Sequence, residues 1–319
     1  MAVYTEVSDE ALAAFLQAYG IGRMVSFKGI AEGVENSNFL LQTEAGQYVL
    51  TLYEKRVNPE ELPYFLGLMQ HLSGKGLAVP LPVAARNGAT LGSLCGRPAA
   101  ICTFLPGVWP RRVRPEHLAP LGTALAQLHL AGADFAVHRA NSLGPSSWQA
   151  LFARAEARAD EVAPGLAAEV GAALRQVLES WPENLPRGEI HADLFPDNVF
   201  FLDGKLSGLI DFYFACTDYF AYDLAVCLNA WCFEPGFAFN VTKARALFGA
   251  YQAVRPLSAA EVAALPVLAR GASLRFLLTR LFDWLNTPEG ALVTRKDPLE
   301  YLRKLRFHAS ARGAEAYGL

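Results

Sequence analysis

Two short stretches decide the fold of this chain: residues 189–201 read EIHADLFPDNVFF, and residues 209–212 read LIDF. Apolar residues on both sides of an intervening Asp-Gly pair predict a β-hairpin, because Asp-Gly is a favoured two-residue hairpin turn. This hairpin brings Asn198, where one strand begins, close to Asp211, where the other ends, and leaves Asp193 on the preceding loop. The sequence therefore predicts that two carboxylates and one carboxamide lie together.

Oxygen ligands of this kind are those that Mg²⁺ selects, with water and substrate phosphates completing its coordination. The offsets H-x-D-x-x-x-x-N, followed by a strand that ends in I-D-F, are also those of the protein-kinase catalytic and metal loops. A lone Asp in a loop is usually a turn or cap residue. Three matching offsets argue against that interpretation for Asp193, Asn198 and Asp211 together.

Length, charge and cysteine content exclude several other classes of protein. The 319 residues are 52% apolar, which suits about two domains with substantial cores. With 28 Lys and Arg against 31 Asp and Glu, the net charge of −3 does not favour nucleic acid or an anionic membrane as a partner. Five cysteines without a C-x-x-C pair indicate reduced thiols, and no secretory signal is recognisable, so we expect a cytoplasmic protein.

Hydrophobic periodicity divides the chain near residue 105. Before it we expect a short helix after Ser8, a helix at 58–72, and strands at 24–29, 38–43, 47–53, 90–94 and 98–104. After it, nearly everything has helical period, with helices expected at 115–131, 147–161, 166–181, 222–232, 240–254 and 258–285. The predicted fold class is α+β, with a small antiparallel-sheet lobe at 1–105 and a larger, mainly helical lobe at 106–319.

With these motifs the chain resembles the aminoglycoside-phosphotransferase-like small-molecule kinases, whose fold is protein-kinase-like and two-lobed. A longer set of matches resembles the bacterial homoserine kinases of that superfamily. These matches lie at 27–39, 48–55, 191–201, 210–218, 222–225, 229–234 and 296–301, and so span both lobes.

The resemblance implies a role for each residue of the motif. Asp193 is the catalytic carboxylate that orients the substrate hydroxyl and accepts its proton, and His191, the second catalytic candidate, fixes the loop. Asn198 and Asp211 hold Mg²⁺, and Asp223 belongs to a motif that supports the loop. Such an enzyme mainly positions an alcohol and neutralises phosphate charge, because phosphoryl transfer passes through a loose transition state.

The implied cofactors are ATP and Mg²⁺, and the implied substrate is L-homoserine, phosphorylated on its side-chain hydroxyl in threonine biosynthesis. Nucleic acid, membrane and an obligate protein partner are not expected. The family covers the nucleotide phosphates with a strand-turn-strand segment, here at residues 29–41, where the candidates are Gly33, Asn36, Ser37 and Asn38. An ordinary hairpin turn is the alternative for that segment.

Residues 101–107 resemble the inter-lobe connector, and Thr103 and Leu105 are the candidates there for binding adenine through the backbone. One departure concerns the strand lysine that many relatives use to bind phosphate, because its position is taken by Thr51. Lys55, on the same strand face, or Lys28, across the meander, are possible replacements, although both also suit a solvated surface.

An amino-acid substrate needs a cation for its carboxylate and an anion for its ammonium group. Arg280 and Asp283 on the last long helix are candidates for these two roles, or they pair with one another at a spacing of three residues. Tyr213, in the aromatic stretch after Asp211, is a third substrate-binding candidate.

Two other functions stay open at this point. One is a kinase of the same fold that acts on choline, a sugar or an aminoglycoside. The other is a nucleotide-binding scaffold without catalysis, which the absent strand lysine suggests.

Overall fold

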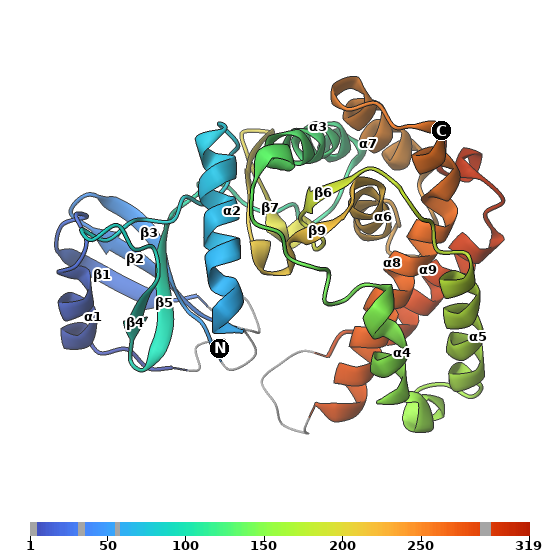
Figure 1. The fold of residues 1–319 in the computed structure, drawn as a ribbon, viewed down its shortest axis with the longest axis horizontal. Helices are drawn as coiled ribbons and strands as arrows, with labels where there is room; N and C mark the ends of the chain where they lie inside the picture. Colours follow the sequence, from blue (N-terminus) through green and yellow to red (C-terminus); the bar gives the residue numbers. More distant parts are fainter. Residues whose placement is uncertain (1–4, 31–35, 55–57, 288–294) are drawn as a thin grey trace. The chain divides into compact units, whose positions relative to one another are not determined.

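The computed structural model describes residues 5–30, 36–54, 58–287 and 295–319 (Figure 1). Its internal contacts divide the chain into two compact units. The first unit consists of Met1–Gly107 and Ser207–Ile210, and the second of Val108–Leu206 and Asp211–Leu319. The division thus falls two residues after the boundary expected from periodicity, and a short piece of the later chain joins the first unit.

The first unit is built on a five-stranded antiparallel sheet with the order β1-β2-β3-β5-β4. Its strands are β1 (Met24–Gly29), β2 (Ser37–Thr43), β3 (Gly46–Leu52), β4 (Gly92–Leu94) and β5 (Arg97–Thr103). Helix α1 (Asp9–Leu16) begins where the Ser8 side chain accepts the N–H of Ala11, and a turn of 3₁₀-helix, η1 (Pro59–Glu61), leads into α2 (Leu62–Gly74). The expected three-stranded meander and both helices are confirmed.

The core of this unit lies between α1 and the sheet. Side chains of β2 alternate between more and less buried positions, as expected for a strand with one covered face. Leu12 and Leu16 of α1 belong to the same buried cluster as Leu41, Leu50 and Ile101 of the sheet. The apolar residues that follow strand periodicity and those that follow helix periodicity thus pack in one core.

The second unit is mainly helical. Its helices are α3 (Pro115–Ala131), α4 (Pro145–Ala153), α5 (Leu166–Glu179), α6 (Phe220–Trp231), α7 (Val241–Val254), α8 (Ala259–Asn286) and α9 (Pro298–Ser310). Two strand pairs accompany them, β6 (Arg187–Ile190) with β9 (Cys216–Tyr219), and β7 (Val199–Leu202) with β8 (Lys205–Leu209). Short 3₁₀ turns complete it: η2 (Gly132–Asp134), η3 (Glu156–Glu161), η4 (Pro196–Asn198), η5 (Phe212–Phe214) and η6 (Ala314–Tyr317). The predicted α+β class is confirmed.

The local structure of this unit differs from the expectations at some places and agrees at others. The predicted β7–β8 hairpin is present, and its turn residues Asp203 and Gly204 both have positive φ, +50° and +75°, as a type I′ turn requires. The helix expected at 147–161 is instead α4 followed by the separate turn η3. Periodicity missed α9 and the β6–β9 pair, whose strands are only four residues long.

Helix α6 is the centre of the second unit. It lies between the β6–β9 pair and α8, and almost all of its residues are buried (Figure 1). Among the described residues, α8 alone is long and apolar enough to cross a membrane. Most of its apolar stretch is buried, packed against α4, α6 and α9, which is the environment of a core helix.

Candidate active site

The loop between β6 and β7 carries the candidate catalytic residues, and Asp223 of α6 binds its backbone. The backbone N–H groups of His191 and Ala192 donate to the two carboxylate oxygens of Asp223, both at 2.8 Å. Ala192 has φ = +61°, a conformation that costs energy for any residue with a side chain. The Asp223 carboxylate therefore keeps the loop in a conformation that the chain would not adopt by itself.

Asp223 is fully buried and is itself oriented by a histidine. His129 Nε2 donates to Asp223 at 3.2 Å, and the Tyr251 hydroxyl donates to His129 Nδ1 at 2.8 Å. Burial raises the pKa of Asp223, but the bonds from His129 and the His191 backbone more than offset this and hold that pKa below its usual value. Burial lowers the pKa of His129. His129 thus has two hydrogen-bond partners inside the fold, as expected for a structural histidine.

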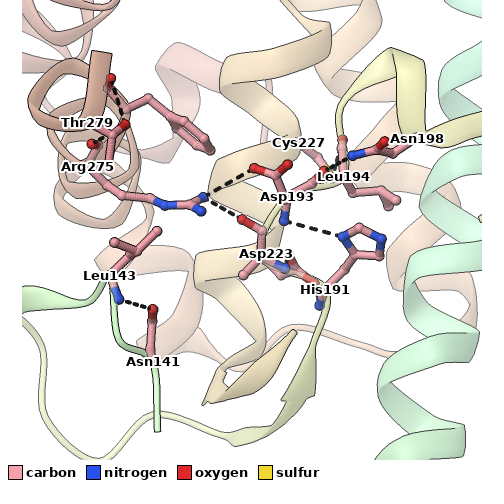
Figure 2. A network of polar contacts seen from close by, with 12 residues as sticks. Asn141, Leu143, His191, Asp193, Leu194, Asn198, Asp223, Cys227, Arg275 and Thr279 are labelled. Carbon is pink, nitrogen blue, oxygen red and sulfur yellow. Dashed lines mark hydrogen bonds and ion pairs between the residues drawn. The ribbon is translucent and has the colours of Figure 1, made fainter. Parts of the chain in front are cut away.

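Asp193 points from this loop towards α8, where it meets Arg275 (Figure 2). Its side chain keeps 19% of its exposure, and one carboxylate oxygen lies 3.6 Å from Arg275 Nη1. The same nitrogen donates to the carbonyl of Ala192. Burial raises the pKa of Asp193, and the positive charges of Arg275 and Lys296 oppose that rise.

Asn198 and His191 lie against Asp193. Asn198 Nδ2 donates to the Asp193 carbonyl at 2.8 Å, and the Asp193 N–H donates to His191 Nδ1 at 3.3 Å. The His191 ring is fully buried and packs on Phe212, with ring centroids 4.7 Å apart. Since Phe212 follows Asp211 directly, this contact connects the segment of Asp211 to the loop that carries Asp193.

Asp211 and Asn198 provide oxygen atoms that suit a hard cation. Asp211 is exposed and has φ = +65°, and in the described part of the chain Asn198 Oδ1 has no hydrogen-bond partner. The residues that the structure describes contain no group of three or more His, Cys, Asp or Glu side chains able to hold a metal ion. An ion here would take most of its ligands from water and substrate phosphates, as Mg²⁺ does.

In the first unit, the candidates of the phosphate segment make internal hydrogen bonds. The fully buried Ser37 hydroxyl donates to Glu54 at 2.7 Å, and Asn36 Oδ1 accepts the Glu54 N–H at 3.3 Å. Asn38 Oδ1 accepts the hydroxyl of Thr51 at 2.8 Å, across the β2–β3 pair. Thr51, which stands where many relatives have the strand lysine, thus makes a hydrogen bond to the neighbouring strand.

The remaining nucleotide candidates are placed as follows. Gly33 and Lys55 lie outside the described residues, and Lys28 is exposed on β1. Thr103 ends β5, where its hydroxyl accepts the N–H of Leu81 at 2.9 Å. Leu105 follows outside any strand and covers Gly208, whose position has no room for a side chain.

The substrate candidates are not gathered at Asp193 by any contact in the described structure. Arg280 forms an ion pair with Glu300 of α9 at 2.6 Å, so its guanidinium is already engaged, and Glu300 also binds Lys304. Asp283 lies three residues further along α8, and Tyr213 is half-buried in η5.

Arg275 is the residue at the site that sequence reasoning missed. It is visible in the sequence as one of several charges that interrupt the apolar pattern of α8. Periodicity cannot say which of these charges is buried, but the structure shows Arg275 at 3% exposure, with its guanidinium over the rings of Phe214 and Phe276.

The fold and this loop define a phosphotransferase of the protein-kinase-like class. Residues 26–257 match the phosphotransferase enzyme family. The chain is 66% identical over 319 residues to a homoserine kinase of Acidiphilium cryptum, covering 100% of both chains. It is also 66% identical to that of Xanthobacter autotrophicus, covering 100% of this chain and 99% of the relative. The chain therefore belongs to the phosphotransferase enzyme family and, within it, to the family of the homoserine kinases.

Solved structures agree with this fold. An amicoumacin kinase in complex with AMP-PNP and Ca²⁺ has a TM-score of 0.70 at 14% identity, covering 96% of this chain and 94% of its own. Spectinomycin phosphotransferase in complex with ADP and spectinomycin has a TM-score of 0.69 at 14% identity, covering 98% of each chain. At this level of identity the likeness concerns the fold.

Proposed function

We propose that this protein transfers the γ-phosphoryl group of ATP to the side-chain hydroxyl of L-homoserine, with Mg²⁺ as the metal ion. The observation that carries the proposal is the full-length identity of 66% to homoserine kinases, in a chain that holds Asp193 on a hydrogen-bonded loop beside Asn198. Cytoplasmic threonine biosynthesis is the setting that we infer for this reaction.

Asp193 is the proposed catalytic residue. Its carboxylate orients the homoserine hydroxyl, whose oxygen forms a bond to the γ-phosphorus while the bond from that phosphorus to the β–γ bridging oxygen breaks. ADP leaves with the electron pair of that bond, and the hydroxyl proton passes to Asp193. Mg²⁺, bound by Asn198 and Asp211, would supply positive charge against the ATP phosphates.

His191 and Asp223 act as positioning residues in this proposal. Neither needs to touch substrate, since His191 accepts the Asp193 N–H and Asp223 accepts two N–H groups of the same loop. Together they orient the Asp193 carboxylate before substrate arrives, which is the main contribution that an enzyme makes to a loose phosphoryl transfer.

For the nucleotide, we propose that the segment around Gly33, Asn36, Ser37 and Asn38, with Lys55, faces the phosphates. The backbone of Thr103 and Leu105 would bind adenine. Support for the second part is that the Leu105 N–H and C=O make no backbone hydrogen bond in the described part of the chain. Ser37 would act through its backbone, because its hydroxyl donates to Glu54, whereas Asn38 could also donate from its side-chain Nδ2, since its bond with Thr51 uses only Oδ1.

ADP release measured with L-homoserine, L-serine, choline and an aminoglycoside tests this function. We expect kcat/KM for L-homoserine to exceed that for the other alcohols by at least about tenfold, and ³¹P NMR to identify O-phospho-L-homoserine. Asp193→Asn and Asp211→Asn are the controls: each should abolish turnover and keep the far-UV spectrum. Activity with choline equal to that with homoserine would refute the assignment, and ATP binding without turnover of any alcohol would support a scaffold.

A further inference from the structure

Two cations lie close enough to Asp193 to influence its ionisation, and they differ in access to solvent. Arg275 is buried, and its guanidinium is used by the Ala192 carbonyl and the Asp193 carboxylate. Lys296 is exposed, directly before Asp297, the residue that caps α9. Arg275 is therefore part of the scaffold of the site, whereas Lys296 can meet a ligand.

Lys296 is placed over the catalytic loop by an aromatic side chain. Its Nζ lies 5.9 Å from the ring centroid of Phe195, and the Phe195 N–H donates to the Asp193 carbonyl at 2.8 Å. The Phe195 ring packs edge-on against Phe276 of α8, the neighbour of Arg275, with centroids 4.9 Å apart. The ammonium group thus lies over Phe195, which comes two residues after Asp193 in the loop.

Lys296 has no ion-pair or hydrogen-bond partner among the residues that the structure describes. The other cations of this region are engaged: Arg280 and Lys304 bind Glu300, and Arg295 donates to the Trp284 carbonyl at 3.4 Å. Lys296 differs from them in offering an exposed ammonium group, without an ion pair to any described residue, beside the loop of Asp193.

The substrate has a group that matches this charge. When the homoserine hydroxyl contacts Asp193, a short carbon chain carries its carboxylate to a position near the loop. A carboxylate there needs a cation that is accessible and can donate a hydrogen bond to it, because a charge-assisted hydrogen bond is stronger than one between neutral groups. An ammonium group on a flexible stem also adapts to the ligand.

We propose that Lys296 binds the carboxylate of the amino-acid substrate and so selects amino acids over other alcohols. This inference rests on the proposed function and extends it to a residue that determines specificity. It replaces Arg280, whose largely buried guanidinium is held by Glu300, as the candidate for the carboxylate.

The experiment compares L-homoserine with 3-aminopropan-1-ol, the same molecule without its carboxylate. Lys296→Met should raise KM for L-homoserine about tenfold or more, the loss expected for one charge-assisted hydrogen bond. Its kcat/KM for 3-aminopropan-1-ol should fall far less, by no more than the effect of the lost charge on Asp193, and Lys296→Arg should keep most of the preference. The matched control is Arg295→Met, which removes the same charge one residue earlier and should leave both substrates unaffected.

Calorimetric binding of the two ligands in the presence of a non-hydrolysable ATP analogue makes the same comparison independently of turnover. Equal losses for both ligands, no loss for either, or a raised KM for ATP alone would each overturn the role of Lys296. Failure of the unmodified protein to phosphorylate L-homoserine would refute the proposed function instead. The two failures are therefore distinguishable.

Discussion

Arg275 connects the loop that carries Asp193, the proposed catalytic residue, to the helical core. Its guanidinium reaches across 83 positions of sequence to the Ala192 carbonyl, whose residue has a strained backbone, and also faces Asp193. A buried guanidinium in such a place holds the loop, and its positive charge opposes the rise that burial causes in the pKa of Asp193.

Replacement of Arg275 tests this role. We expect Arg275→Met to lower kcat about 10- to 100-fold, in line with the loss of one hydrogen bond to a charged group. Arg275→Lys should recover only part of the activity because it lacks the planar fork. The matched control is Arg270→Met on the same helix, where the guanidinium bonds Gln176 at the surface. A kcat for Arg275→Met within twofold of wild type, in steady-state assays, would contradict the role.

At the scale of elements, the close packing of α3 on α7 deserves a test, because α3 carries His129. Gly122 of α3 lies so near α7 that a side chain there would meet the backbone carbonyl of Leu247. Gly249, on α7 itself, has open space where a side chain would be. Replacing these two glycines with alanine should therefore change the stability in opposite directions.

Gly122→Ala should destabilise the protein by about 1–3 kcal/mol, since backbone atoms must move apart. Gly249→Ala, the control on the neighbouring helix, should stabilise it by about 0.5–1 kcal/mol through the better helix propensity of alanine. Urea unfolding at constant pH measures both changes. A stabilising Gly122→Ala would show that α3 and α7 are less closely packed than described.

At the scale of the whole molecule, buried histidines make stability depend on pH. His308 of α9 donates through Nε2 to Asn229 Oδ1 of α6 at 3.2 Å and accepts the Tyr317 hydroxyl at Nδ1 at 3.0 Å. Burial lowers the pKa of His308 to about 3. The neutral ring therefore links α6, α9 and the final residues of the chain.

This pKa predicts acid sensitivity with a defined sign. The folded state binds the His308 proton less readily than the unfolded state. The contribution of neutral His308 to the free energy of unfolding is therefore complete above pH about 6.5 and is lost as the pH falls towards 3. At pH 5 the loss from His308 amounts to about 2 kcal/mol. Unfolding free energies of wild type and His308→Gln at pH 7.5 and 5 test it: the variant should lose less. Equal losses would show that His308 titrates normally.

The local pattern of the sequence predicted most of the fold. The β7–β8 hairpin, α3 at 115–131 and the three-stranded meander follow from turn residues and periodicity, which are properties of neighbouring residues. The single helix expected at 147–161 was wrong, and α9 was missed. Fixed offsets likewise picked out Asp193 and Asn198, which the structure joins through the Asp193 carbonyl.

What the sequence alone determined is therefore the α+β class and the loop that joins Asp193 to Asn198, because short-range patterns encode both. The tertiary structure decided which distant side chains serve that loop: Asp223 beneath it, Arg275 beside it and Lys296 above Phe195. It also placed Arg280 in an ion pair with Glu300. Helical periodicity tells which residues face the core, but only the packing of separate helices decides which partner each charge meets.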